Sequence, residues 1–138
     1  MTFSLDRQLK ADTLPIAELA SCELLLMNDS RWPWLILVPR IENAVELHEL
    51  FTDQRQDIDF DVANSAAALK AVSGCEKINI ASLGNAVRQL HIHVVARSDG
   101  DPNWPGPVWG FEERLPYTND LETGIIQNMQ NMLELGTS

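Results

Sequence analysis

Two of the three histidines of this 138-residue chain, His91 and His93, stand two positions apart in a run of aliphatic and β-branched residues. Residues 89–95 have the composition of a β-strand. Because side chains alternate between the faces of a strand, Gln89, His91 and His93 are predicted on one face and the aliphatic residues on the other. An imidazole is neutral over much of the physiological range and nucleophilic at a ring nitrogen, so a histidine placed there can attack a phosphorus atom.

Two other interpretations of the histidine pair remain open. A histidine on a strand is more often a hydrogen-bonded structural residue than a catalyst. A His-x-His pair can also supply two zinc ligands, provided that further histidine, cysteine or carboxylate ligands come from elsewhere. The preceding loop favours an anion site, because Gly84 and Asn85 tolerate unusual backbone angles and leave N–H groups free to cradle an anion.

The residues around the pair resemble the signature of the histidine triad (HIT) family, in which three histidines alternate with apolar residues. The resemblance rests on Asn79, on Gly84-Asn85-Ala86-Val87 and on Gln89-Leu90-His91-Ile92-His93-Val94-Val95. It covers the second and third histidines, whereas Gln89 replaces the first. The stretch Asp101-Pro102-Asn103-Trp104-Pro105-Gly106-Pro107-Val108-Trp109-Gly110 resembles a bacterial branch with the same exchange.

The resemblance implies a role for each residue of the triad. It implies that His91 is the nucleophile, and the other ring nitrogen of His91 is expected to be held by an acceptor such as a backbone carbonyl. His93 is expected to hydrogen-bond a phosphate oxygen or the leaving group. Gln89 can only orient the substrate, since a carboxamide does not change charge near neutral pH. Many family members carry another histidine where this chain has Glu42, and His48 is expected to be a surface residue of a helix.

The loop before the triad is expected to bind the α-phosphate. Its backbone N–H groups and the Asn85 side chain would contact the non-bridging oxygens, with Asn79 beside them. Arg88 and Arg97 add local positive charge. The predicted substrate-binding residues are therefore Gln89, Asn79, Gly84, Asn85, Ala86 and Val87, and no metal ligand set or cofactor is expected.

The resemblance thus implies a nucleotide hydrolase or nucleotidyl transferase that forms a nucleotidyl-histidine intermediate. Its expected substrates are dinucleoside polyphosphates, such as diadenosine tetraphosphate, or nucleoside phosphoramidates. A nucleotide-binding module that turns over poorly because of Gln89 and Glu42 is one alternative, and the zinc site is the other. A homodimer is also implied by the family.

Composition limits the possible partners and compartment. The chain length suits one domain, residues 1–138, and a content of 45% hydrophobic and 22% charged residues is that of a soluble globular protein. A formal net charge of -10 argues against binding of long nucleic acids, although the local field inside a pocket can still favour a small nucleotide. No apolar run is long enough to span a membrane. Two cysteines are too few for a disulfide scaffold, so a cytoplasmic protein with reduced cysteines is expected.

The predicted fold class is α+β. Apolar runs and turn signals predict an antiparallel sheet of strands 23–28, 34–39, 76–81 and 89–96, with a helix over 51–73 packed on it. A second helix is predicted over 119–135, ending before Gly136, with Leu121 on its apolar stripe. Residues 4–20 are expected to form a short helix or turn followed by an extended stretch. The tryptophan-rich segment 98–116 is expected to be an ordered loop, either a wall of the site or a dimer contact, or a loop packed over the sheet edge.

Overall fold

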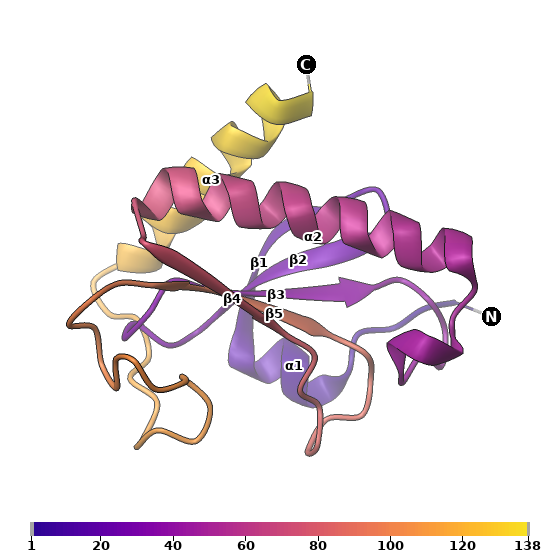
Figure 1. Ribbon diagram of the computed structural model, residues 1–138, viewed down its shortest axis with the longest axis horizontal. Coiled ribbons are helices and arrows are strands. Elements are labelled where there is room, and N and C mark those ends of the chain that lie inside the picture. Colours follow the sequence, from indigo (N-terminus) through magenta and orange to yellow (C-terminus); the bar gives the residue numbers. More distant parts are fainter. Residues whose placement is uncertain (1, 138) are drawn as a thin grey trace.

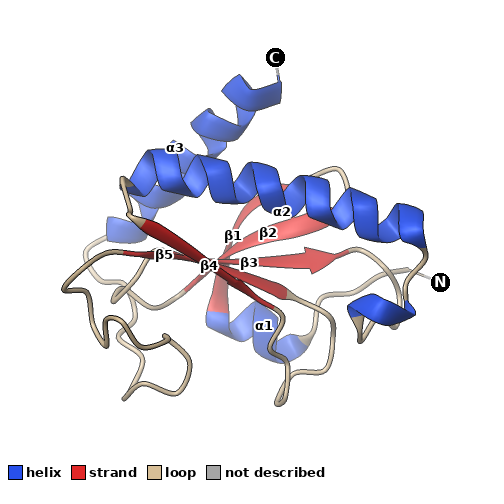
Figure 2. Cartoon of the chain, viewed as in Figure 1, coloured by secondary structure: helices blue, strands red, loops and turns tan. Residues whose placement is uncertain are grey.

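The computed structural model describes residues 2–137, which form one five-stranded antiparallel sheet with helices on both of its faces (Figures 1 and 2). The strands are β1 (Thr13–Glu18), β2 (Cys22–Met27), β3 (Trp34–Pro39), β4 (Lys77–Ala81) and β5 (Ile92–Arg97), in the order β1-β2-β3-β5-β4. The helices are α1 (Arg7–Asp12), the short 3₁₀ helix η1 (Leu47–Glu49), α2 (Thr52–Ser73) and α3 (Leu121–Thr137). The predicted α+β class and the β2–β3 hairpin are confirmed.

Strand β1 corrects the prediction of a four-stranded sheet. It pairs antiparallel with β2, and Pro15 stands opposite Leu25. Proline lacks a backbone N–H and is therefore confined to edge strands or irregular positions. Strand β1 is an edge strand, and its register shifts between Pro15 and Ala17. The proline that weakened the strand signal in the sequence is therefore accommodated at the sheet edge.

Helix α2 covers one face of the sheet, as its apolar stripe predicts (Figure 1). Ile58, Val62 and Leu69 are buried in the main core. The helix ends at Gly74, whose backbone is left-handed at φ 68°, a conformation that glycine adopts without steric cost. The long helix and its glycine cap are both confirmed.

Helix α3 packs against α2 and differs from the prediction at both of its ends. Met129 is fully buried, but Leu121 is 63% exposed because it lies at the first turn, beyond the core. At the other end the helix continues through Gly136 to Thr137, so that glycine does not terminate it.

Strand β5 begins at Ile92, three residues later than the predicted strand 89–96, and both of its faces are buried. Leu90 before it and Ile92 and Val94 within it belong to the core under α2, as the alternation predicts. The opposite face meets a second core built on residues such as Trp32, Trp34, Ile36, Val95 and Val108. In Figure 1 this face is covered by α1 and by the loop that follows β5. The tryptophan-rich segment therefore packs over a face of the sheet and not over its edge.

Cys22 and Cys75 are both free and buried, as expected of reduced packing residues. Among residues 2–137, no helix combines the length and the apolar character needed to cross a bilayer.

Candidate active site

His91 lies just before the first residue of β5, and only 5% of it is exposed. Its Nδ1 atom is 2.7 Å from the backbone carbonyl oxygen of Gln89. Because a carbonyl oxygen only accepts, Nδ1 carries the proton and the lone pair is on Nε2. The structure thus contains the backbone contact that the sequence analysis expected for this ring, and Nε2 is the nitrogen available for nucleophilic attack.

Gly84 allows the loop before β5 to approach this imidazole closely. A Cβ atom added at residue 84 would lie 2.5 Å from the Val87 carbonyl oxygen and 3.2 Å from His91 Cε1. The first distance is shorter than any ordinary carbon–oxygen contact, so only glycine fits without a shift of the backbone. This close approach explains why residue 84 is a glycine.

The loop and the histidine line a cavity of about 260 Å³, called here the histidine cavity. Its wall includes Ser82, Gly84, Asn85, Arg88, Gln89 and His91, together with residues 45–46. Within the described residues, the side chains of Ser82, Asn85 and Arg88 and the backbone amides of Gly84, Asn85 and Arg88 make no hydrogen bond to the protein. The acidic side chain in the wall is Glu46. Several free donors and one guanidinium therefore surround a space that fits a phosphate group.

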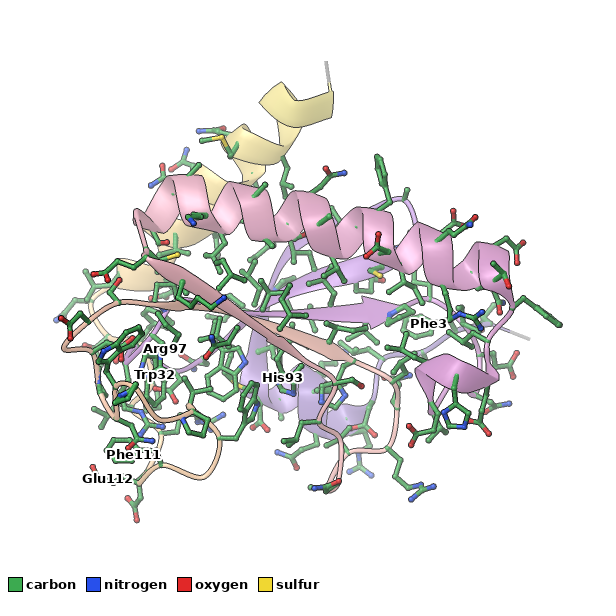
Figure 3. All side chains as sticks on the ribbon, in the orientation of Figure 1. Phe3, Trp32, His93, Arg97, Phe111 and Glu112 are labelled. Atoms are coloured by element: carbon green, nitrogen blue, oxygen red, sulfur yellow. The ribbon has the colours of Figure 1, made fainter. Side chains whose placement is uncertain are left out.

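His93 is held on both sides of its ring, and 4% of it is exposed. The indole Nε1–H of Trp34 donates to Nδ1 at 3.0 Å, and Nε2 lies 3.1 Å from the carbonyl oxygen of Leu83. Since an indole nitrogen only donates, Nδ1 is the acceptor and the proton is on Nε2. Burial lowers the pKa of His93 to about 4, and the hydrogen bond to Leu83 opposes this shift. His93 is therefore a neutral ring under the sheet (Figure 3).

These contacts correct the expectation that His93 bonds a phosphate oxygen or a leaving group. Both of its nitrogens are already used, one by β3 and one by the loop that forms the histidine cavity. Its ring centroid lies 4.9 Å from that of His91 and 5.4 Å from that of Trp109. His93 thus positions the loop and the neighbouring imidazole.

Gln89 lines the histidine cavity, but its carboxamide is engaged elsewhere. Its Oε1 atom accepts a hydrogen bond from the backbone N–H of Asp6 at 2.8 Å, and its Nε2 atom donates to the carbonyl oxygen of Ser4 at 2.9 Å. The expectation that Gln89 contacts the substrate is therefore replaced by a contact with the N-terminal segment.

Asn79 and Arg97 lie away from the histidine cavity. Arg97 is only 1% exposed and forms a two-pronged ion pair with Asp101, and Asn79 Oδ1 lies 3.5 Å from the same guanidinium. The guanidinium also donates to the carbonyl oxygen of Gly106. In Figure 3 Arg97 lies close to Trp32, toward the tryptophan-rich loop. The expected phosphate contact of Asn79 and the expected charge of Arg97 at the site are thus corrected, because both side chains lie at the guanidinium that holds that loop.

The remaining residues named in the sequence analysis also lie outside the histidine cavity. Ala86 is exposed and does not line the histidine cavity. Val87 turns its side chain into the second core. Glu42 is exposed, and His48 is an exposed residue of η1.

The donors needed for a zinc site are not assembled. Residues 2–137 contain no group of three or more histidine, cysteine or carboxylate side chains able to hold a metal ion. Of the four ring nitrogens of the histidine pair, only Nε2 of His91 has no partner among residues 2–137. The geometry gives the zinc alternative no support.

Sequence reasoning missed Ser82 and Trp34. Trp34 precedes a long apolar run, and its contact with His93 depends on the β3–β5 register, in which Trp34 pairs with Val95 and Ile36 pairs with His93. No local signal reveals that register. Ser82 adjoins the Gly84-Asn85 turn, and this proximity was the available signal.

Comparisons with known proteins place this geometry in a family. Residues 8–100, more than half of the chain, match the model of the HIT domain. A search of curated proteins gave no match.

Three solved structures are similar over almost their whole length. A histidine triad protein from Sinorhizobium meliloti is 48% identical, with a TM-score of 0.92 over 94% of this chain and 96% of that one. One from Marinobacter aquaeolei VT8 is 41% identical, with a TM-score of 0.93 over 98% of each chain. One from Bradyrhizobium japonicum is 38% identical, with a TM-score of 0.93 over 96% and 99%. The family match and these similarities, together with the His91 and His93 geometry, show that the chain belongs to the histidine triad (HIT) family.

Proposed function

We propose that the protein is a nucleotide-binding hydrolase or nucleotidyl transferase that attacks the α-phosphate of a nucleoside phosphate derivative through His91. The observation that carries this proposal is the arrangement of the histidine cavity. The Nδ1 contact with Gln89 leaves Nε2 of His91 free, and Ser82, Gly84, Asn85 and Arg88, whose donors make no hydrogen bond within the described residues, line the same space. Donors aimed at non-bridging oxygens stabilise the charge that develops during phosphoryl transfer.

The reaction has two steps in this proposal. The Nε2 lone pair of His91 forms a bond to the α-phosphorus while the bond from phosphorus to the leaving group breaks. The resulting nucleotidyl-histidine is cleaved by water in a hydrolase or by an acceptor hydroxyl or phosphate in a transferase. The Gln89 carbonyl oxygen holds the ring throughout and stabilises the positive charge that the imidazole gains.

The absence of an acid beside His91 favours one substrate class. Burial keeps His93 neutral, and both of its nitrogens are hydrogen-bonded to the protein. Gln89 does not ionise, and among the described residues the carboxylate that lines the histidine cavity is that of Glu46. An amine leaving group needs a proton, whereas a polyphosphate departs as a stable anion. The proposal therefore favours dinucleoside polyphosphates over nucleoside phosphoramidates.

A substrate panel tests this function. Purified protein is incubated with dinucleoside polyphosphates of different chain lengths and with matched phosphoramidates, and both binding and turnover are measured. Turnover of the polyphosphates above that of the phosphoramidates is expected, and its loss in His91→Ala is the control. Nucleotide binding without turnover of any member would instead favour a catalytically weak binding module, the second candidate, which the engagement of His93 and Gln89 supports.

We also propose that the protein is a cytoplasmic homodimer. The buried free cysteines suit a reducing compartment. Strand β4 is an edge strand, and Ile80 on it and Leu83 after it are 53% and 41% exposed, which suits pairing with a second copy. Analytical ultracentrifugation of wild type and Ile80→Lys measures the oligomeric state. Wild type is expected to be a dimer and Ile80→Lys to shift toward monomer, whereas a monomeric wild type would refute the proposed dimer.

A further inference from the structure

The carboxamide of Gln89 joins the N-terminal segment to the site across more than eighty residues of sequence. It accepts from Asp6 N–H at 2.8 Å and donates to the Ser4 carbonyl oxygen at 2.9 Å. Asp6 in turn caps α1, because its side chain accepts from the amides of Gln8 and Leu9. The segment 4–6 is thus fixed at both of its ends.

The same residue also holds the nucleophile. The backbone carbonyl oxygen of Gln89 accepts from His91 Nδ1, so its backbone orients the imidazole while its side chain orients the segment 4–6. A histidine at position 89 could not make both side-chain bonds. The two nitrogens of an imidazole point away from each other on a rigid ring, whereas the oxygen and nitrogen of a carboxamide lie side by side.

The segment held by Gln89 forms one wall of a second cavity of about 560 Å³, called here the N-terminal cavity. Residues 2–7 and residues 42–45 line it, and it shares Gln89 and Val45 with the histidine cavity. The two cavities therefore adjoin across the Gln89 side chain. His91 also lies against His93, whose ring contacts Trp34 and Trp109.

The charges of the N-terminal cavity select what it can hold. Asp6 and Glu42 are acidic, and Arg7 is the basic residue in the same wall. A polyphosphate would meet a net negative wall there, while an uncharged sugar or base with hydroxyl or amino donors would find carboxylate acceptors. In the histidine cavity the arginine is Arg88, which suits the phosphates. Phe3 adds an aromatic face to the N-terminal cavity and lies toward the N-terminal end of the chain in Figure 3.

We propose that Gln89 is a positioning residue that fixes segment 4–6 as a wall of the N-terminal cavity, and that the nucleoside part of the substrate lies in this cavity. The second half of this inference rests on the proposed function, because it assumes that the α-phosphate occupies the histidine cavity. The first half depends only on the contacts of Gln89.

Two measurements on Gln89→Met test it, since methionine keeps the side-chain length and removes both hydrogen bonds. The first is amide hydrogen exchange at Asp6, whose N–H donates to Gln89. The second compares the affinities for adenosine monophosphate and for inorganic phosphate, which needs only the histidine cavity. Gln130→Met is the matched control, because Gln130 Nε2 also donates to a backbone carbonyl, that of Ile16, away from both cavities.

The expected result is faster exchange at Asp6 and an affinity for adenosine monophosphate lowered about tenfold, with phosphate affinity unchanged. Gln130→Met should alter none of these quantities. Unchanged exchange at Asp6 would overturn the positioning role. An equal loss of phosphate and nucleotide affinity would overturn the placement of the nucleoside. If wild-type protein bound neither ligand, the proposed function and this placement would both fail, and the exchange measurement would still decide the role of Gln89.

Discussion

The Nδ1 atom of His91 lies 2.7 Å from the carbonyl oxygen of Gln89, and this hydrogen bond distinguishes the two histidines of the motif. Both rings are almost fully buried, at 5% and 4% exposure. His93 uses both nitrogens inside the protein, whereas His91 uses only one. Hydrogen bonding, and not burial, therefore separates the nitrogen that can react from those that hold the structure.

We predict that Gly84→Ala disables the histidine cavity while leaving the fold intact. The new Cβ would lie 2.5 Å from the Val87 carbonyl oxygen and 3.2 Å from His91 Cε1, so the loop or the ring must move. Overpacking of this kind costs about 1–3 kcal/mol at a well-packed site. Phosphate and nucleotide affinities should fall at least about tenfold, as measured by titration.

Gly124→Ala provides the control for that substitution. Nothing lies within 4 Å of a Cβ atom added at residue 124, and alanine favours the helix α3. This variant should bind phosphate like wild type. Equal affinities in both variants would show that the close approach of Gly84 to His91 is unimportant.

We predict that His93 makes stability depend on pH below neutrality. Burial lowers the pKa of His93 from 6.5 to about 4, so the unfolded chain takes up this proton more readily than the folded one. Its contribution is fully present above about pH 6.5 and is lost as the pH falls toward about 4. The free energy of unfolding should fall by on the order of 2 kcal/mol from this group between pH 7 and pH 5.

Urea denaturation at the two pH values measures this effect. His93→Gln keeps a donor and an acceptor but cannot gain a charge, so its loss of stability over the same interval should be smaller than that of wild type. The same loss in wild type and variant would show that another group is responsible.

We predict that Arg97 is required for stability and does not bind phosphate directly. Replacing it with methionine leaves the Asp101 carboxylate without its buried partner, which costs about 3 kcal/mol or more in the free energy of unfolding. Arg114→Met is the matched control. Arg114 pairs with Asp12 at 3.0 Å, but their side chains are 41% and 28% exposed, so the cost should stay below about 1 kcal/mol. Similar midpoints for the two variants in urea would contradict this distinction.

Short-range patterns in the sequence predicted the elements of the fold well. The alternation in residues 89–95 placed Leu90, Ile92 and Val94 in the core under α2, and the helical spacing of Ile58, Val62 and Leu69 identified the buried stripe of α2. Each of these signals repeats within a few residues. Strand β1 was not predicted as a strand of the sheet, because proline is disfavoured in strands except at a sheet edge. Whether a strand lies at an edge depends on the whole sheet and cannot be read from the residues around Pro15.

The contacts that define the site depend on pairs of residues far apart in the chain. Gln89 meets Ser4 and Asp6, and His93 meets Trp34, only after the sheet has formed. The residue types of the motif suggested phosphate chemistry, but they could not show that His93 is already hydrogen-bonded on both sides. The role that the motif suggested for His93 was therefore corrected only by the pairing of β3 with β5, which brings Trp34 to its ring.

If Nε2 of His91 forms a covalent bond to the α-phosphorus, the nucleotidyl-histidine intermediate can be trapped. Protein incubated with an α-³²P-labelled dinucleoside polyphosphate is quenched with base, digested and mapped by mass spectrometry. Acid-sensitive, base-stable label is expected on the peptide that contains His91, and none in His91→Ala. Turnover of the substrate with no label on His91, or label that persists in His91→Ala, would rule out nucleophilic attack by this imidazole.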